Sequence, residues 1–92
     1  MLTQISVTYK VTFSQKAIKV LREFPKDYQN KIKESAKKLS TDPFNMNLQK
    51  MRTSEATHRL RVGSYRLFLL IDTTLKEIII TTIRRRTTQT YH

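Results

Sequence analysis

The first stretch of the chain alternates strictly between two kinds of residue. Apolar, aromatic or β-branched residues take every second position from residue 3 to residue 13, namely Thr3, Ile5, Val7, Tyr9, Val11 and Phe13. Polar residues fill the positions between them. A period of two places alternate side chains on opposite faces of a strand. The pattern therefore predicts a half-buried β-strand over residues 3–13.

The next segment changes to a helical period. Ser14 is a favourable N-cap, and Pro25 ends one helix and begins a second one. Asp42-Pro43 ends the second helix. The apolar residues recur every three or four positions, as Ala17, Val20, Leu21 and Phe24 and then as Tyr28, Ile32, Ala36 and Leu39. We therefore expect a helical hairpin in which each helix has one apolar face.

The second half of the chain predicts three strands after an irregular connection. Residues 44–56 are mixed, with Phe44, Met46, Leu48 and Met51 as expected anchors. A connection of this length is typical of a functional segment or one that contains a short strand. Strands are expected over 57–63, 65–72 and 75–83, with turns at Gly63-Ser64 and Asp72-Thr73-Thr74. Residues 84–92 are expected to form a basic, polar tail.

This order of elements defines a fold class. The sequence predicts an α+β protein of order β-α-α-β-β-β. Its sheet would be twisted and mostly antiparallel, with the N-terminal helical hairpin packed on one face. The length of 92 residues fits one domain over residues 1–92.

Charge narrows the choice of partners. The formal net charge is +11, which favours a polyanionic partner such as nucleic acid or an acidic protein. There is no cysteine, so disulfides, thiol nucleophiles and zinc–thiolate sites are excluded. No apolar run is long enough to cross a membrane, and no signal-peptide core is present, so a cytoplasmic protein without a membrane partner is expected.

Arginines concentrate on the predicted strands. Arg59 and Arg61 are two residues apart, so their side chains leave the same face, and Arg66 follows just across the turn. Arg85 ends the last apolar run, and Tyr91 follows six residues later. Planar guanidinium groups on a rigid sheet match the geometry of a phosphate diester. The alternative interpretation is an exposed edge hairpin whose charges prevent edge pairing.

Other catalytic sets are missing from the sequence. His58 alternates onto the expected core side, and His92 is the last residue. The seven acidic residues are scattered without metal-ligand spacing. There is no phosphate-binding glycine loop, dinucleotide fingerprint or zinc motif. An enzyme of this sequence would therefore use no metal and no other cofactor, and would be built from arginine and tyrosine.

These motifs resemble a known family. The segment "HRLRVGSYRLFLLI" and the end "RRRTTQTY", in this order of elements, resemble the RelE/ParE toxin superfamily on its RelE side. The family's basic pair, glycine turn and Tyr-Arg correspond to Arg59, Arg61, Gly63 and Tyr65-Arg66. Its terminal arginine and tyrosine correspond to Arg85 and Tyr91. Two departures are the arginine pair, where lysine is frequent, and Arg84, where relatives often have histidine or lysine.

The resemblance implies the toxin of a type II toxin–antitoxin system. Such toxins cut messenger RNA in the ribosomal A site by attack of the 2′-hydroxyl on the adjacent phosphorus. It implies an endoribonuclease whose partners are the ribosome, mRNA and an acidic, RelB-like antitoxin in a hetero-oligomer. Its implied catalytic residues are Arg61, Arg66, Arg85 and Tyr91, and its implied RNA-binding residues are Arg59, Arg84 and Arg86.

Two alternatives stay open from the sequence. A ParE-like protein would keep the fold but inhibit gyrase without cutting RNA. A non-enzymatic RNA- or ribosome-binding module would account for the charge but gives no reason for Tyr91. The combination of the arginines with Tyr91 favours the nuclease.

Overall fold

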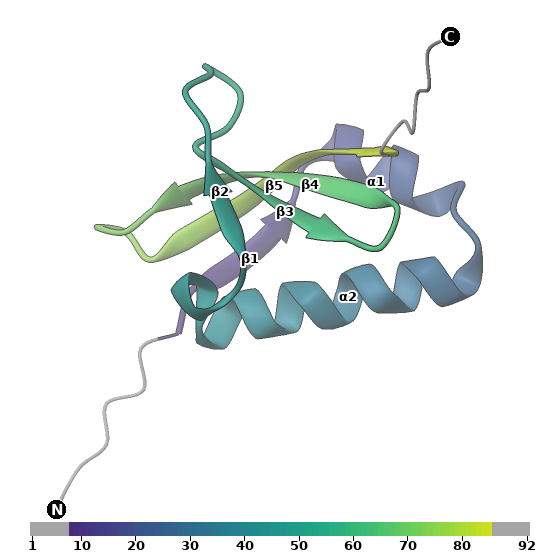
Figure 1. Cartoon of the computed structure of the whole chain (residues 1–92), viewed down its shortest axis with the longest axis horizontal. Helices are drawn as coiled ribbons and strands as arrows, with labels where there is room; N and C mark the ends of the chain where they lie inside the picture. The colour runs from purple at the N-terminus through teal and green to yellow at the C-terminus, as the bar shows by residue number, and fades with distance from the viewer. Residues whose placement is uncertain (1–7, 86–92) are drawn as a thin grey trace, which may run out of the picture.

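A five-stranded sheet forms the centre of the molecule (Figure 1). The computed structural model describes residues 8–85. Its elements are β1 (Lys10–Phe13), α1 (Gln15–Arg22), α2 (Lys26–Thr41), the 3₁₀ helix η1 (Pro43–Asn45), β2 (Leu48–Lys50), β3 (His58–Val62), β4 (Tyr65–Asp72) and β5 (Glu77–Arg85). The strand order is β1-β5-β4-β3-β2. Strand β1 runs parallel to β5 and the other neighbours are antiparallel, so the predicted α+β class is confirmed.

Most predicted boundaries agree with the structure, and four predictions need comment. Of the strand predicted over residues 3–13, Lys10–Phe13 is a strand in the structure. Thr8 and Tyr9 are described but are not part of it, and residues 3–7 lie outside the described range. The connection over 44–56 does contain a short strand, β2. The predicted start of the basic tail at Arg84 is wrong, because β5 continues to Arg85 in register with β4.

The last strand also begins later than predicted, at Glu77. The Asp72 carboxylate accepts hydrogen bonds from the backbone N–H groups of Thr74 (3.0 Å) and Leu75 (2.9 Å). A side chain that bonds to the backbone in this way stabilises a turn in place of strand pairing. Leu75 is consequently 64% exposed in the turn, where the sequence predicted an apolar strand residue.

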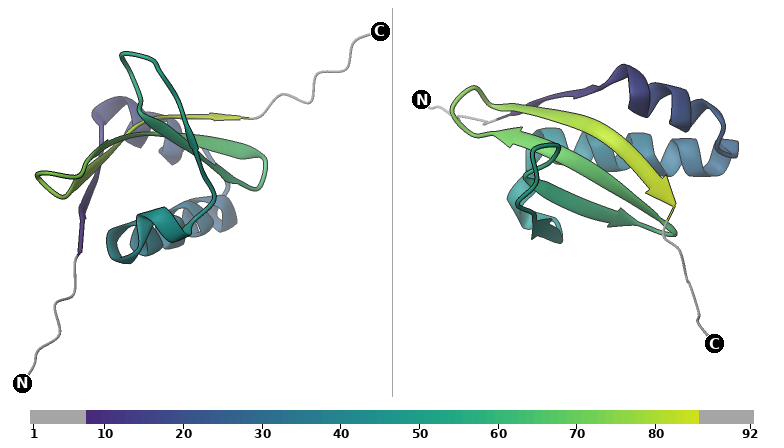
Figure 2. Two further views of the ribbon diagram at one scale, coloured as in Figure 1. Left: turned by 60° about the vertical axis from the view of Figure 1, so that its left-hand side comes forward. Right: turned by 90° about the horizontal axis from the view of Figure 1, so that it is seen from above.

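Both helices cover the same face of the sheet, which we call the helix face (Figure 2). Ala17 and Leu21 from α1 and Ile32 and Leu39 from α2 share one buried cluster with alternate residues of the sheet, namely Leu60, Tyr65, Leu67, Leu69, Ile78, Ile80 and Ile83. Alternation on the strands and helical spacing on the helices produce this single core. Of the anchors expected in the connection, Met46 and Leu48 pack against it, whereas Phe44 is 55% exposed.

The turn between β3 and β4 uses the single glycine of the chain. Gly63 has a φ of 60°, a left-handed conformation that glycine adopts without strain. A Cβ at this position would meet the Tyr28 ring at 3.0 Å. The predicted tight turn is therefore confirmed, and it closes against α2. Within residues 8–85, neither helix is long and apolar enough to cross a membrane.

Candidate nucleic-acid interface

A β-bulge in β5 decides which arginines face away from the helices. Ile78 and Ile80 pair with Ile71 and Leu69, but Phe68 pairs with Thr82, so Thr81 is the extra residue. A one-residue shift moves every later side chain to the opposite face. After the bulge, Ile83 lies on the helix face and Arg84 on the open face.

Ser14 holds this bulge in place. Its hydroxyl donates to the Thr81 carbonyl (2.7 Å) and accepts from the Ala17 N–H (3.1 Å), and its own N–H donates to the Ile80 carbonyl (2.9 Å). The predicted N-cap is therefore confirmed, and it has a second role that the sequence did not indicate. The Thr81 hydroxyl also donates to the Phe68 carbonyl (3.1 Å). The start of α1 thus fixes the register of the strand that carries Arg84.

The open face carries a row of arginines, and we call it the arginine face. Arg61 of β3 pairs directly with Arg66 of β4, and Arg66 pairs with Arg84 of β5. Side chains of directly paired residues lie on the same face, with their Cβ atoms about 5 Å apart. Arg59 is two residues before Arg61 on the same face. The row extends across three adjacent strands and concentrates positive charge on a rigid surface.

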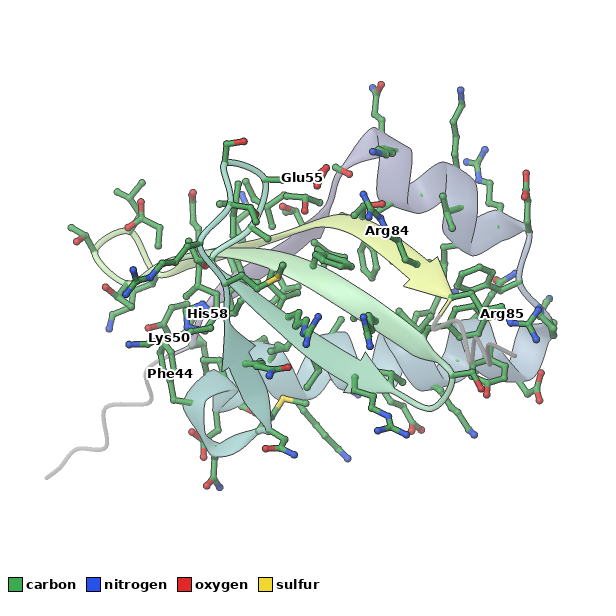
Figure 3. The ribbon with its side chains drawn as sticks, turned by 45° about the horizontal axis from the view of Figure 1, so that its top comes forward. Phe44, Lys50, Glu55, His58, Arg84 and Arg85 are labelled. Carbon is green, nitrogen blue, oxygen red and sulfur yellow. The ribbon has the colours of Figure 1, made fainter. Side chains whose placement is uncertain are left out.

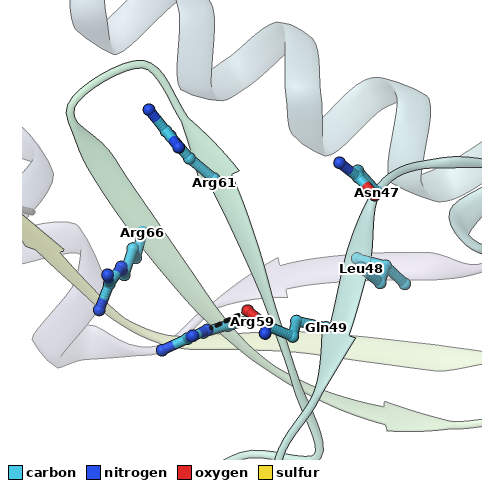
Figure 4. Close-up of a pocket in the computed structure, with 6 residues that line it drawn as sticks. All are labelled: Asn47, Leu48, Gln49, Arg59, Arg61 and Arg66. Carbon is cyan, nitrogen blue, oxygen red and sulfur yellow. Dashed lines mark hydrogen bonds between the residues drawn. The ribbon is translucent and has the colours of Figure 1, made fainter.

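A hollow of about 460 Å³ opens on this face beside β2 (Figure 4). Three arginines line it, with the side chains of β2 and of the residue before that strand: Asn47, Leu48, Gln49, Arg59, Arg61 and Arg66. Arg59 donates from Nε to Gln49 Oε1 at 2.8 Å. This volume lies in the range typical of small-ligand sites. The hollow has the size and charge to take a nucleotide phosphate.

Arg84 lies at the end of the row formed by β5, on the opposite side of β4 from Arg61. Its guanidinium group lies 5.2 Å from the Phe68 ring centroid, a cation–π distance. Glu55, in the β2–β3 connection, lies 3.8 Å from Arg84 Nη2 and 3.8 Å from Lys16 Nζ. All three side chains are substantially exposed, so these ion pairs contribute little stability. Arg84 is therefore positioned by a ring beneath it and by one acid.

Arg85 lies on the other side of the sheet. It pairs with Tyr65, whose ring stacks on Phe24 (centroids 4.1 Å apart) and meets Tyr28 edge-on (4.7 Å). Figure 3 shows Arg84 near Glu55 and Arg85 at the end of β5. The structure thus brings together Arg59, Arg61, Arg66 and Arg84. It does not bring Arg85 onto the arginine face, because the bulge reverses the order that uninterrupted alternation predicts.

Two titratable groups near the sheet have shifted pKa values. Burial lowers the pKa of His58 below its ordinary value of 6.5, and the positive charge of Lys50 adds to this effect. His58 is half-buried and lies on the expected core side. Contact with the Ser64 hydroxyl and backbone lowers the pKa of Tyr28, with a smaller contribution from Lys31. Tyr28 lies beside the β3–β4 turn and not in the hollow.

The remaining predicted site residues are Arg86 and Tyr91, which lie outside the described residues. Sequence reasoning missed Asn47, Gln49 and Glu55. A three-residue strand is too short to show a period of two, so no pattern indicated that Gln49 would face Arg59. In the part of the chain that the structure describes, no three acidic or histidine side chains come close enough to hold a metal ion.

Comparisons with known proteins give consistent structural matches. No protein-family model matches the chain, and a search of curated proteins gave no significant match. A chain of the RelBE2 toxin–antitoxin complex from Mycobacterium tuberculosis is 28% identical, with a TM-score of 0.76 over 87% of this chain and 100% of that one. A chain of the archaeal RelE–RelB complex from Pyrococcus horikoshii is 23% identical, with a TM-score of 0.78 over 89% and 99%.

A toxin solved without its antitoxin has the same fold as this chain. The E. coli RelE toxin is 13% identical, with a TM-score of 0.67 over 88% of this chain and 87% of that chain. At this identity the likeness is one of fold alone. The sheet order, the helical hairpin and these matches together show that the protein is RelE-like, with the fold of the toxin subunits of RelBE complexes.

Proposed function

We propose that the protein is the toxin of a type II toxin–antitoxin system and a ribosome-dependent endoribonuclease that cleaves mRNA in the A site. The observation that carries the proposal is the row formed by Arg61, Arg66 and Arg84 on three adjacent strands. Like charges that are directly opposite destabilise a sheet. A polyanion that binds across the row offsets this repulsion, which gives the row a functional explanation.

The proposed reaction is a transesterification. The ribose 2′-hydroxyl attacks the adjacent phosphorus and the 5′-oxygen leaves, so the products are a cyclic phosphate and a 5′-hydroxyl. The transition state carries more negative charge on its phosphoryl oxygens than the ground state does. Fixed cations aimed at those oxygens therefore accelerate the reaction. The reaction as proposed uses no metal ion or other cofactor.

Each arginine has a proposed role. Arg61 and Arg66 clamp the scissile phosphate, because they pair directly at the hollow. Arg59 binds the neighbouring backbone. We assign neutralisation of the phosphorane to Arg84, since the bulge places it in the row and places Arg85 on the helix face. Arg86 remains a proposed contact to RNA.

Tyr91 is the proposed proton acceptor for the 2′-hydroxyl, or alternatively a ring on which a base stacks. A phenol of pKa about 10 is a weak base at neutral pH, and neighbouring cations lower its pKa. A site with so few groups that can transfer protons depends on another molecule to align the RNA. The ribosome would supply that alignment by holding the message in position for in-line attack.

The proposed partner besides the ribosome is an acidic, RelB-like antitoxin in a cytoplasmic hetero-oligomer. Two observations support it: the net charge of +11, and the similarity to chains whose solved structures are RelE–RelB complexes. Acidic residues of such a partner would offset the arginines while its apolar residues cover exposed apolar surface.

The decisive experiment is cleavage on programmed ribosomes, mapped by primer extension. We expect new 5′ ends within the A-site codon, little cutting of the same RNA without ribosomes, and no loss of activity at EDTA levels that leave ribosomes intact. Expression of the protein alone should arrest growth, and co-expression of an acidic protein encoded by an adjacent gene should restore it. Unchanged messages together with inhibited gyrase supercoiling would overturn the proposal in favour of a ParE-like activity.

A further inference from the structure

Among the described side chains, hydrogen-bond donors predominate at the end of the hollow near Gln49, where Arg59 and the Gln49 amide meet. Arg59 has only N–H donors, and its Nε donates to Gln49 Oε1 at 2.8 Å. This contact fixes the orientation of the amide, because a flipped amide would place its NH₂ group against a guanidinium donor. Arg59 therefore engages the Gln49 oxygen. No described residue accepts a hydrogen bond from Gln49 Nε2, so its protons are available to a bound ligand (Figure 4).

The other residues near Gln49 add to this excess of hydrogen-bond donors. Arg61 and Arg66 line the same hollow and also present donors only. Asn47, the other amide, lies two residues before Gln49, on the far side of Leu48, and no hydrogen bond to a described residue fixes its orientation. Among residues 8–85, no acidic side chain lines the hollow. A phosphate on Arg61 and Arg66 would place the attached nucleoside within reach of Gln49.

Donors on the protein select for acceptors on the base. Guanine presents O6 and uracil presents O4, whereas adenine and cytosine present amino groups, N6 and N4, at the equivalent edge position. An amino group facing Gln49 Nε2 would leave two donors opposed and one of them without a partner. A donor that the bound base covers without offering it an acceptor is costly, and discrimination of this kind is a source of specificity.

We infer that Gln49, oriented by Arg59, is a specificity-determining residue that favours a keto base over an amino base next to the cleaved phosphate. The inference rests on the proposed function, since it concerns the substrate of the same site. Arg59 then has two roles. Its charge binds the backbone, and its Nε sets the polarity of the amide that contacts the base.

The test is the base composition at cut sites on ribosomes programmed with a library of A-site codons. Wild-type protein should favour guanine or uracil beside the cut by about 3- to 10-fold, the effect of one hydrogen bond. Gln49→Met keeps the length of the side chain but removes its polar atoms, and should flatten the preference. Gln49→Glu keeps an oxygen for Arg59 and turns the other group into an acceptor, so the preference should move toward adenine or cytosine.

A matched control separates charge from hydrogen bonding. Gln15→Glu makes the same change of net charge on the exposed start of α1, away from the hollow, and should leave the base preference unchanged. Gln49 is exposed, so its variants should fold, which circular dichroism verifies. Cleavage by Gln49→Met with the wild-type base pattern would overturn this inference alone. Absence of cleavage by the wild-type protein would overturn the proposed function and, with it, this inference.

Discussion

The same three strands present opposite chemistry on their two faces. On the helix face, Leu60, Leu67 and Ile83 are at most 4% exposed and pack beneath the helices. On the arginine face, Arg66 pairs directly with both Arg61 and Arg84. The first arrangement stabilises the fold through apolar burial, and the second opposes it through like-charge repulsion. The helix face therefore stabilises the fold and the arginine face carries the proposed function, so substitutions on one face should affect stability and substitutions on the other should affect activity.

The largest expected effect is on stability, from the helix face. Leu69 is fully buried and pairs with Ile80 in the centre of the sheet. Leu69→Ala should lower the free energy of unfolding by about 2–5 kcal/mol, because it removes buried methyl groups and leaves a cavity. Urea denaturation measures the change. Leu70→Ala, one residue along on the opposite face, is the control and should cost clearly less. Equal losses from the two variants would contradict the division between the faces.

The next effect is on activity, from the arginine face. Arg66→Ala should slow single-turnover cleavage by about 10²-fold, because Arg66 is the centre of the row. The same variant should unfold at an equal or slightly higher urea concentration, since two like-charge pairs are removed.

Lys37→Ala is the control for long-range electrostatics. Lys37 is an exposed residue of α2, so its loss should weaken association and its salt dependence without changing the rate at saturation. A saturated rate that Lys37→Ala abolishes and Arg66→Ala leaves intact would show that the active site lies elsewhere.

A third prediction uses two neighbours on one strand. Arg84 and Arg85 differ by one residue and lie on opposite faces because of the bulge at Thr81. Arg84→Ala should slow cleavage at saturation by about tenfold or more relative to Arg85→Ala, because only Arg84 extends the row. Single-turnover rates on programmed ribosomes measure both variants. The reverse order would restore the assignment of Arg85 that the motif resemblance implies.

The contrast between Arg61 and Arg84 shows how far the sequence predicts the site. Arg59 and Arg61 lie on the open face as expected, because a short strand beside a glycine turn leaves only one way to alternate. The faces of Arg84 and Arg85 are set by the bulge at Thr81. The Thr81 carbonyl accepts a hydrogen bond from Ser14, which is 67 residues away in the chain. Periodicity within β5 contains no information about that contact.

The same reasoning applies to the other elements. The helices were predictable because caps and prolines act locally, as at Ser14 and Pro25. The sequence predicts strand β2 only as one of two alternatives for the 44–56 connection, and it does not identify Gln49 as a site residue. A strand of three residues is defined by its partner, β3, and not by its own pattern.

The smallest expected effect is a pH dependence of stability on the helix face. His58 is half-buried, its Nδ1 lies 2.9 Å from the Thr57 hydroxyl, and burial lowers its pKa in the folded state below 6.5. Between the lowered pKa and 6.5, the unfolded chain binds more protons at this residue than the folded chain does. The contribution of neutral His58 to the free energy of unfolding is therefore complete above about pH 6.5 and is lost as the pH falls through the folded pKa.

His58→Gln should remove this pH-dependent contribution, so that urea midpoints at about pH 7.5 and about pH 5.5 differ less in the variant than in the wild type. The rate of cleavage at saturation should not follow the same titration, because His58 lies across the sheet from the arginines. Parallel pH profiles of stability in the two proteins would show that His58 does not cause this pH dependence. A cleavage rate that titrates with His58 would show that the two faces are coupled.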